Sequence, residues 1–487
     1  MDRLHDACGV VGIYTPWCNQ RTEIVQYLIL ALTALQHRGQ ESAGIAVYKS
    51  SGEIAHVVGM GKVHEVFADG GATLPVTYCG IGHVRYSTTG SSCIENAGPC
   101  VVGADQDKHK VIALAHNGNL ANSADLRKQL PPELLHTMTD SEVLALMLHS
   151  AHGVTLRERM ISIVPHLRGA YSLTILAEGK LYAMRDPWGM RPLCLGRLNN
   201  SWIVASESCA LDRIGAAFVR SIEPGEFVTI DEDGVHVEIL LQAQRQSLCV
   251  FEHIYFSDAT SQLHGRSVYS VREAMGRALA REHPAEADLV VAVPETAIPA
   301  ALGYAAEIGI PYGYAIIKNP YSDRTFIKPD QQQRQVALEQ KFKLVKSAIA
   351  GARLIVIDDS IVRGTTMKHL VAALRRNGAK EIHLRSSAPP LRYPCHFGID
   401  IPQEAELIAS GRSMQEIATY FGVDSLGYLS LAGLSRSLQK KTAYTSDNGR
   451  NIDVLHAHFC YGCLEKSGWP FNPEETGELL QHVKTTR

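Results

Sequence analysis

Short runs of β-branched and aromatic residues fill the first half of the chain, with Gly, Asn and Asp at the turns between them. Such runs, bounded by turn residues, are typical of short strands. They lie at 8–14, 43–49, 79–87, 110–118, 170–186, 201–208 and 226–240. Between them, residues 22–36, 141–151 and 155–167 carry apolar positions at helical spacing. The first half is therefore predicted to consist of mostly antiparallel sheets packed with helices.

The rhythm changes after about residue 245, where strand-like and helix-like segments alternate. Strands are predicted for the apolar runs at 288–294, 314–318, 352–358 and 381–388, and helices for segments near 297–308 and 367–378. Alternation of this kind is typical of a parallel sheet with crossover helices. The 487 residues are enough for two or three domains, so the second half is expected to be a separate α/β domain.

The composition excludes several classes of protein. Hydrophobic residues at 45% and charged residues at 20% are typical of a soluble globular chain. A balance of 47 basic and 50 acidic residues, net −3, provides no global field for nucleic acid or anionic membranes. Apolar stretches such as 24–35 are too short to span a membrane, and the amino end lacks the pattern of a secretory signal. We expect a cytoplasmic protein without nucleic-acid or membrane partners.

Residues 354–366, LIVIDDSIVRGTT, combine a buried strand, two acids, a short polar loop and a helix start. Backbone N–H groups of such a loop and helix terminus can bind a phosphate. Asp358 and Asp359 can accept sugar hydroxyls or hold Mg²⁺ through oxygen ligands. A lone pair of acids is also what an ordinary strand-end turn carries. The complete string is more specific, and it predicts a phosphosugar site.

This string resembles the 5-phosphoribosyl 1-pyrophosphate signature of type I phosphoribosyltransferases, in the form found in the amidophosphoribosyltransferase family. The resemblance places the 5-phosphate on residues 360–366, with Ser360, Gly364, Thr365 and Thr366, and the ribose hydroxyls on the two acids. It also identifies VAVPETA at 291–297 as the pyrophosphate loop, where Thr296 approaches the metal or the pyrophosphate. Lys318 and Arg324 correspond to a flexible lid. Mg²⁺ is implied as cofactor, held by Thr296, Asp358 and Asp359.

Cys8 stands after a seven-residue leader, in ACGVVGIY. A free α-amino group, with an unperturbed pKa near 7.7–8.0, can act as general base for the thiol of the same residue. Cys8 resembles the N-terminal nucleophile of class II glutamine amidotransferases, which implies that residues 1–7 are a propeptide removed by autocatalytic processing. Alone, Cys8 would be read as a buried cysteine at the start of a strand.

Four further segments match the same family in order: 34–45, 82–90, 114–122 and 139–144. The resemblance implies that Arg85 binds the glutamine α-carboxylate and Asp140 its α-ammonium group. Asn117 and Gly118 form the oxyanion hole. Arg38 and Gly39 belong to the loop that shapes the glutamine pocket. Singly, these residues are ordinary polar turn residues. RDPWGMRPLCLG at 185–196 and ASESCAL at 205–211 also fit, and we interpret Arg185, Asp186 and Glu207 as framework.

Four of the eleven cysteines stand in flanking sequences that resemble the ligand contexts of a [4Fe–4S] cluster found in one branch of the family: Cys249, Cys395, Cys460 and Cys463. Their spacing alone would equally suit zinc. The expected role of the cluster is structural, because the transfer reaction requires no electron. The other cysteines have no such context and are expected to be packing residues.

The resemblance covers roughly residues 8–470 and implies glutamine-dependent amination of 5-phosphoribosyl 1-pyrophosphate, the first step of purine synthesis. It also implies an N-terminal-nucleophile αββα sandwich at 8–240, and a type I phosphoribosyltransferase domain with a C-terminal cluster-binding segment at 250–487. Purine nucleotides as inhibitors and a homotetramer or homodimer are further expectations from the family.

Some residues depart from the family pattern. Asp258 and Thr260 replace an arginine and an aspartate, and Pro320, Ser322 and Asp323 precede Arg324 where the family has other residues. Because these changes remove positive charge near an anionic substrate, a relative that aminates a modified phosphosugar remains an alternative. A regulator that senses a phosphoribosyl ligand is a second alternative, although it would have no need of a glutaminase.

Overall fold

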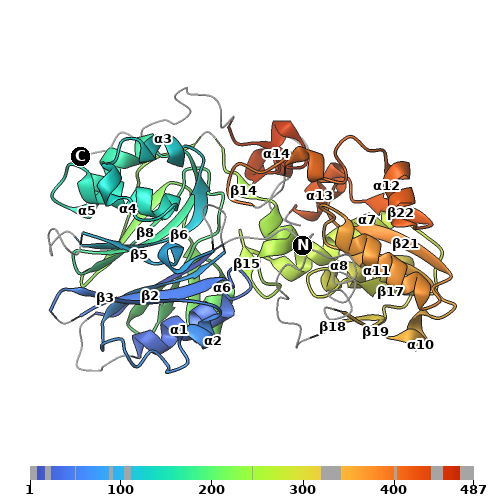
Figure 1. Ribbon diagram of the computed structural model, residues 1–487, viewed down its shortest axis with the longest axis horizontal. Helices are drawn as coiled ribbons and strands as arrows, with labels where there is room; N and C mark the ends of the chain where they lie inside the picture. Colours follow the sequence, from blue (N-terminus) through green and yellow to red (C-terminus); the bar gives the residue numbers. More distant parts are fainter. Residues whose placement is uncertain are drawn as a thin grey trace, which may run out of the picture.

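The computed structural model has two lobes, the first built from the first half of the chain and the second from the second half (Figure 1). It describes residues 8–16, 23–49, 51–86, 92–103, 111–243, 245–319, 342–399, 403–439 and 453–471. Within these residues, no helix has the length and apolar character required to cross a membrane.

The first lobe contains two antiparallel sheets. The first, in the order β11-β9-β10-β1-β4-β2-β3, comprises β1 (Gly9–Tyr14), β2 (Ser42–Tyr48), β3 (Ile54–Met60), β4 (Cys79–Arg85), β9 (Cys194–Leu198), β10 (Ser201–Ala205) and β11 (Ala217–Ser221). The second, in the order β13-β12-β8-β7-β6-β5, comprises β5 (Cys100–Val102), β6 (Ile112–Leu120), β7 (Gly169–Ala177), β8 (Lys180–Arg185), β12 (Glu226–Asp231) and β13 (Gly234–Ile239).

Helices cover the outer face of each sheet (Figure 1). On one side lie α1 (Ile24–Ala34), α2 (Val63–Val66) and α6 (Ser208–Arg213), and on the other α3 (Ser123–Arg127), α4 (Asp140–Ser150) and α5 (Leu156–Ile163). Strand β1 shows how the sequence produces these layers. Val10 packs between the two sheets, whereas Val11 and Ile13 pack in the cluster that contains α1, because successive side chains of a strand point to opposite faces. The expected αββα sandwich is confirmed.

The second lobe is built on a parallel sheet in the order β17-β20-β21-β22. Its strands are β17 (Leu289–Ala292), β20 (Arg353–Asp358), β21 (Glu381–Ser386) and β22 (Ser425–Tyr428). Its helices are α7 (Val268–Glu282), α8 (Ile298–Ile308), α10 (Lys346–Ile349), α11 (Thr365–Arg376), α12 (Met414–Phe421), α13 (Leu431–Ser437) and α14 (Val454–His458). The α/β alternation of the sequence is confirmed.

One predicted strand, at 314–318, lies outside this sheet. Just before this segment, Tyr312 makes a single parallel bridge with Val290, and Pro311 has no N–H to extend that ladder. Strand β18 (Ile316–Lys318) then pairs antiparallel with β19 (Phe342–Leu344) in a separate sheet. The alternating pattern was therefore wrong about the partner of this strand.

The carboxyl-terminal segment returns to the junction between the lobes. Strand β14 (Leu248–Cys249) pairs parallel with β23 (Phe459–Cys460), so that Cys249 lies opposite Cys460. A short hairpin, β15 (Gln262–Leu263) and β16 (Arg266–Ser267), precedes α7. The junction thus brings residues near 250 and 460 together.

Candidate active sites

A cavity of about 340 Å³ opens at the first lobe where β1, β4 and β6 meet. Cys8, Arg85, Gly118 and Asp140 all contribute to its lining. Cys8 precedes β1, Arg85 ends β4, Gly118 lies in β6 and Asp140 begins α4. The structure thus gathers the predicted nucleophile, carboxylate-binding arginine, oxyanion glycine and ammonium-binding aspartate around one space.

The thiol of Cys8 is nearly buried, and its Sγ lies 3.6 Å from the carbonyl oxygen of Tyr86. Tyr86 follows β4 directly, so the antiparallel pairing of β1 with β4 places the start of one strand beside the end of the other. Arg85 is buried in the same wall of the cavity. The pairing of β1 with β4 thus brings the Cys8 thiol and the Arg85 guanidinium to the same cavity.

The predicted oxyanion residues have a distinctive backbone and side chain. Asn117 is fully buried, and neither its amide nitrogen nor its amide oxygen has a hydrogen-bond partner among the described residues. Gly118 has φ +153°, and a Cβ atom there would lie 1.9 Å from the carbonyl oxygen of Ala170. Only glycine fits this position. Gly118 lines the cavity, whereas Asn117 lies next to it in β6 and is not part of the cavity lining.

Asp140 is held firmly. Its Oδ2 accepts the Leu120 N–H at 2.9 Å, and its Oδ1 lies 3.7 Å from His116 Nδ1. Burial would raise the pKa of Asp140, but His116 and the hydrogen bonds outweigh burial and lower it. The Thr139 hydroxyl caps α4 by accepting the N–H of Glu142 at 3.2 Å. The carboxylate therefore stays ionised and oriented at the cavity.

Arg38 does not line the cavity, but it contacts the backbone of Cys8, which does. Its Nε donates to the carbonyl oxygen of Cys8 at 3.0 Å, and its terminal nitrogens donate to Glu207 and Glu252. Burial alone would lower the pKa of Arg38, but these carboxylates raise it. Gly39 allows close approach of this loop to β4, since a Cβ atom would lie 2.6 Å from the Val84 carbonyl carbon.

The predicted framework residues are buried and bonded within the fold. Arg185 donates to the backbone oxygens of Arg191, Gly189 and Ile222 at 2.7–2.8 Å. Asp186 accepts backbone N–H groups, including that of Trp188 at 3.0 Å. These contacts agree with a structural role.

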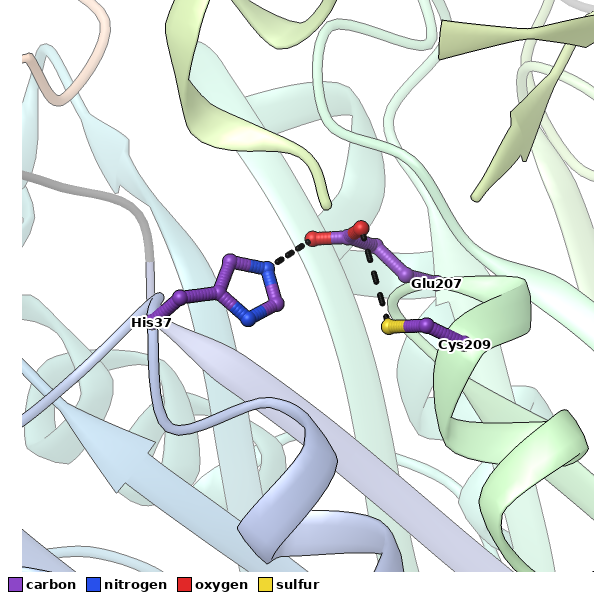
Figure 2. Close-up of side chains that lie close together, drawn as sticks. All are labelled: His37, Glu207 and Cys209. Carbon is purple, nitrogen blue, oxygen red and sulfur yellow. Dashed lines mark hydrogen bonds and ion pairs between the residues drawn. The ribbon is translucent and has the colours of Figure 1, made fainter. Parts of the chain in front are cut away.

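His37, Glu207 and Cys209 form the one group of three potential metal ligands within 4.8 Å of one another among the described residues (Figure 2). His37 Nε2 lies 2.8 Å from Glu207 Oε1. The same carboxylate also accepts Arg38 Nη1 at 2.5 Å and Ser261 Oγ at 2.7 Å. A second cation would have to displace a charge-assisted bond, so the group serves the packing of the junction.

The predicted phosphosugar loops meet at the carboxyl ends of the parallel strands. Asp358 ends β20, and residues 359–364 connect it to α11, which begins at Thr365 and continues through Thr366. Thr296 Oγ1 donates to Asp359, and Ser360 Oγ donates to the same carboxylate at 2.9 Å. Both predicted acidic residues are buried. The predicted metal-ligand set therefore comes together from two separate loops.

Gly364 and Lys318 are two further residues of the predicted phosphosugar site. Gly364 has φ +80° at the start of α11, and a Cβ atom would lie 2.6 Å from Ile408 Cδ1. Lys318 pairs with Glu295 of the pyrophosphate loop at 2.8 Å. Arg324, Pro320, Ser322 and Asp323 lie outside the described residues.

Sequence reasoning did not identify Tyr428 at the end of β22. Its hydroxyl is buried without a partner among the described residues, and burial together with the charge of Asp358 raises its pKa. It follows no motif, and only the parallel pairing of β21 with β22 brings it beside this site.

Two of the residues that depart from the family pattern, Asp258 and Thr260, lie among the described residues. Asp258 lies at the junction between the lobes. Its backbone N–H donates to Glu207 at 2.8 Å, and its Oδ1 accepts both the N–H and the hydroxyl of Thr260 at 2.8 and 2.6 Å. Both residues thus form a local turn.

The four selected cysteines come together beside the junction. Cys249 and Cys460 are opposite in register, and the Cys463 carbonyl accepts the Arg392 N–H at 2.9 Å, close in sequence to Cys395. Each thiol is free, and burial raises the pKa of all four, that of Cys249 to about 12. The charges of the other cysteines raise the pKa of Cys463 further. Such a group favours a bound metal, because a metal stabilises thiolates that burial disfavours.

Comparison with known proteins agrees with this arrangement. Residues 100–213 match a glutamine amidotransferase domain, and residues 262–389 a phosphoribosyl transferase domain. The amidophosphoribosyltransferase of Mycobacterium tuberculosis H37Rv is 44% identical over 451 residues, 90% of this chain and 84% of the relative. That of Archaeoglobus fulgidus is 43% identical over 440 residues, 89% of this chain and 94% of the relative.

This chain belongs to the amidophosphoribosyltransferase family. Among solved structures, the glutamine phosphoribosylpyrophosphate amidotransferase of B. subtilis, complexed with ADP and GMP, superposes with a TM-score of 0.84. It is 38% identical, and the match covers 94% of this chain and 96% of that one. The chain is thus a glutamine-dependent enzyme that aminates 5-phosphoribosyl 1-pyrophosphate in purine synthesis.

Proposed function

We propose that Cys8 is the nucleophile of glutamine hydrolysis in this enzyme, and that the cavity beside it binds glutamine. One observation carries this proposal: Cys8, Arg85, Gly118 and Asp140 line a single cavity, although they are far apart in sequence. The Arg85 guanidinium suits the α-carboxylate of glutamine and the Asp140 carboxylate suits its α-ammonium group. These two contacts orient the carboxamide carbon toward the thiol.

Removal of residues 1–7 frees the α-amine of Cys8, which serves as the general base. The α-amine of Cys8 takes the thiol proton as sulfur adds to the carboxamide carbon. The Asn117 amide and the Gly118 region stabilise the negative oxygen that forms. Collapse of this intermediate breaks the C–N bond, and the proton passes to the departing ammonia. Water then hydrolyses the γ-glutamyl thioester to glutamate. Two observations support this role: the Asn117 amide has no hydrogen-bond partner among the described residues, and Asn117 directly precedes Gly118, which lines the cavity.

The second site binds 5-phosphoribosyl 1-pyrophosphate. Residues 360–366 bind the 5-phosphate through loop N–H groups and hydroxyls, and Asp358 binds the ribose hydroxyls. Thr296, Asp358 and Asp359 would hold Mg²⁺, whose preference for hard oxygen ligands they match. Bound there, Mg²⁺ neutralises negative charge on the pyrophosphate. Lys318 and Arg324 belong to the segment that covers the sugar. Ammonia forms the new C–N bond at C1 as pyrophosphate leaves.

The cysteines fit a [4Fe–4S] cluster better than a single zinc ion. Four thiolates around zinc lie about 3.8 Å apart, because each Zn–S bond is about 2.3 Å long. No three of Cys249, Cys395, Cys460 and Cys463 lie within 4.8 Å of one another. A larger cluster suits the wider spacing. These residues would hold it as a structural element between β14 and β23.

Regulation and assembly follow from the relatives. The B. subtilis structure contains ADP and GMP, and purine nucleotides are proposed as inhibitors here. A homotetramer or homodimer and a cytoplasmic location are proposed from the family resemblance of the sequence, not from that structure.

The experiment is intact-mass analysis of active protein combined with assays of Cys8→Ala. The mature chain is expected to begin at Cys8. The variant is expected to lose glutamine-dependent amination and to retain amination by ammonium salts, because transfer takes place in the other lobe. Full activity with residues 1–7 retained would contradict the proposal, and so would glutamine hydrolysis by Cys8→Ala.

A further inference from the structure

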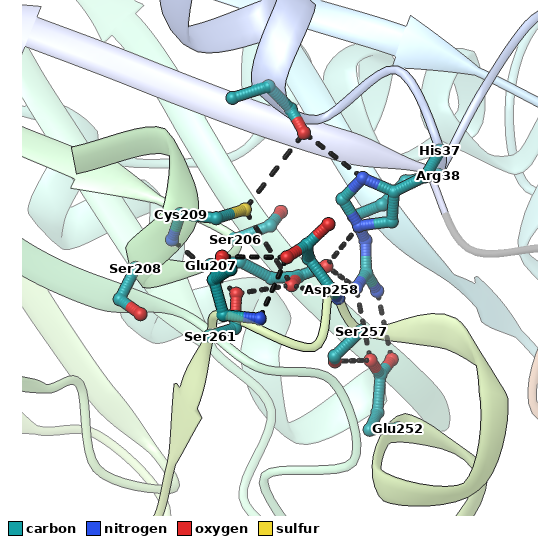
Figure 3. Close-up of polar contacts among 12 residues, drawn as sticks. His37, Arg38, Ser206, Glu207, Ser208, Cys209, Glu252, Ser257, Asp258 and Ser261 are labelled. Atoms are coloured by element: carbon teal, nitrogen blue, oxygen red, sulfur yellow. Dashed lines mark hydrogen bonds and ion pairs between the residues drawn. The ribbon is translucent and has the colours of Figure 1, made fainter. Parts of the chain in front are cut away.

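Four buried charged residues form a continuous network behind the glutaminase cavity. Glu252 occupies its centre, in the helical turn that leads into the second lobe. Its Oε1 accepts Arg38 Nη2 at 2.9 Å and Arg191 Nη1 at 3.3 Å, and its Oε2 accepts Arg38 Nη1 at 3.0 Å. Glu207 Oε1 accepts the same Arg38 Nη1 (Figure 3). All four side chains are almost completely buried.

The network reaches two parts of the glutaminase site. Through Arg38 Nε it contacts the carbonyl oxygen of Cys8 at 3.0 Å. Through Arg191 Nη2 it contacts the carbonyl oxygen of Gly398 at 2.8 Å. Gly398 packs on the backbone of Gly118 in β6, since a Cβ atom on Gly398 would lie 3.2 Å from the carbonyl carbon of Gly118. Through the two arginines, the Glu252 carboxylate therefore restrains both Cys8 and the segment that packs on Gly118.

The charges of the network cancel. Two arginines and two glutamates give zero net charge, and ion pairing with Arg38 opposes the effect of burial and lowers the pKa of Glu252. A buried charge without a partner is strongly unfavourable. Removing any one member therefore leaves an uncompensated unit charge behind Cys8. At an effective dielectric constant of about 20, a unit charge about 12 Å away shifts a pKa by roughly one pH unit.

We infer that Glu252 is a positioning residue of the glutaminase: it holds Arg38 on the Cys8 carbonyl and Arg191 on the turn beside Gly118, at zero net charge. The inference rests on the proposed role of Cys8. Glu252 does not contact the cavity, and it comes from the segment that joins the two lobes. The linker thus completes the site in which glutamine is hydrolysed.

The inference predicts opposite electrostatic effects for two variants. Glu252→Gln leaves a net positive charge, which disfavours the protonated α-amine of Cys8, so the acid limb of the glutaminase profile shifts to lower pH. Arg191→Gln leaves a net negative charge and shifts that limb to higher pH. Each shift is expected to be about one pH unit, and kcat is expected to fall roughly 10-fold to 100-fold.

The other charged and titratable groups close to Cys8 are the same residues in both variants. Arg38 and Arg85 are nearby cations. The carboxylates of Glu95, Asp140 and Glu142 line the cavity, as do the imidazoles of His56 and His136. The imidazoles of His83 and His116 also face this space. Burial lowers the pKa of His83 to about 3, so this residue does not change charge in the assay range.

The experiment measures glutaminase kcat and KM against pH for the mature full-length enzyme and these variants. Arg191→Lys keeps the charge and loses the paired contacts, so it is expected to lower kcat without moving the profile. The double variant Glu252→Gln/Arg191→Gln is expected to restore the wild-type acid limb. Arg159→Gln is a matched control, because it breaks a buried arginine pair with Glu178 elsewhere in the lobe.

Ammonia-dependent amination shows whether each variant is folded. Shifts of the two single variants in the same direction would overturn the inference, as would wild-type kcat and an unmoved profile in Glu252→Gln. If a glutamine variant fails to fold, Arg191→Lys decides the matter, and an unchanged kcat there overturns the inference. Cys8→Ala is assayed in parallel, because residual hydrolysis by that variant would refute the proposed nucleophile separately.

Discussion

Asn117 offers a test in which activity and stability should separate. Its side chain is fully buried in β6, and both amide atoms lack partners among the described residues. A buried polar group without a partner costs about 1–3 kcal/mol of stability. If the amide instead serves the oxyanion, removing it costs catalysis about 2.7–4 kcal/mol, or roughly 100-fold to 1,000-fold in kcat.

The substitution Asn117→Ala therefore has opposing effects on stability. It removes the unpaired amide, which stabilises the fold, and it leaves a small cavity, which destabilises it. We expect the free energy of unfolding to remain within about 1 kcal/mol of wild type, because the two terms are of similar size. Glutaminase kcat is expected to fall by about two to three orders of magnitude, and ammonia-dependent amination to persist.

The assay combines glutamate release, ammonia-dependent amination and urea denaturation. Asn122→Ala is the matched control, because the Asn122 amide is satisfied: it donates to the His166 carbonyl at 2.8 Å and accepts the Arg168 N–H at 3.1 Å. That variant should lose about 1–2 kcal/mol of stability with unchanged glutaminase activity. A glutaminase loss under about fivefold in Asn117→Ala would refute the oxyanion role. A stability loss above about 2 kcal/mol would refute the view that the resting amide is unpaired.

Three further predictions concern other parts of the molecule. Asp358→Asn and Asp359→Asn should each reduce phosphosugar-dependent amination roughly 30-fold to 1,000-fold and leave basal glutaminase largely intact, as steady-state kinetics would show; equal loss of both activities would contradict this. Anaerobically purified protein should contain close to four irons per chain, and Cys460→Ser should lose iron and stability, whereas stoichiometric zinc would favour the other metal. Burial lowers the pKa of His253 to about 3, below its ordinary value of 6.5. The unfolded chain therefore binds a proton that the folded chain does not, and His253→Phe should flatten the loss of stability as pH falls from about 6.5 toward 3, measured by denaturation at several pH values.

Local patterns in the sequence were sufficient for most of the elements, and they singled out Cys8, Arg85, Gly118 and Asp140, which the fold brings to one cavity. The strand at 8–14 and the helix near 297–308 follow from the period of their apolar positions, which each element needs for its own burial. Cys8, Asn117 and Asp358 stand in short motifs whose local backbone serves their chemistry. The strand at 314–318 was assigned the wrong partner, because strand propensity does not specify which edge a strand pairs with.

The tertiary structure alone decided how the two lobes share a site. The sequence indicated that Arg38 belongs to the glutamine loop, but folding directs its guanidinium toward Glu252, a residue 214 positions away. Neither Glu252 nor Arg191 has a motif that marks this role. Ion pairing between distant segments depends on where the backbone brings opposite charges together and removes water from them. A local pattern contains neither the partner nor the burial, and both arise only when the chain is folded.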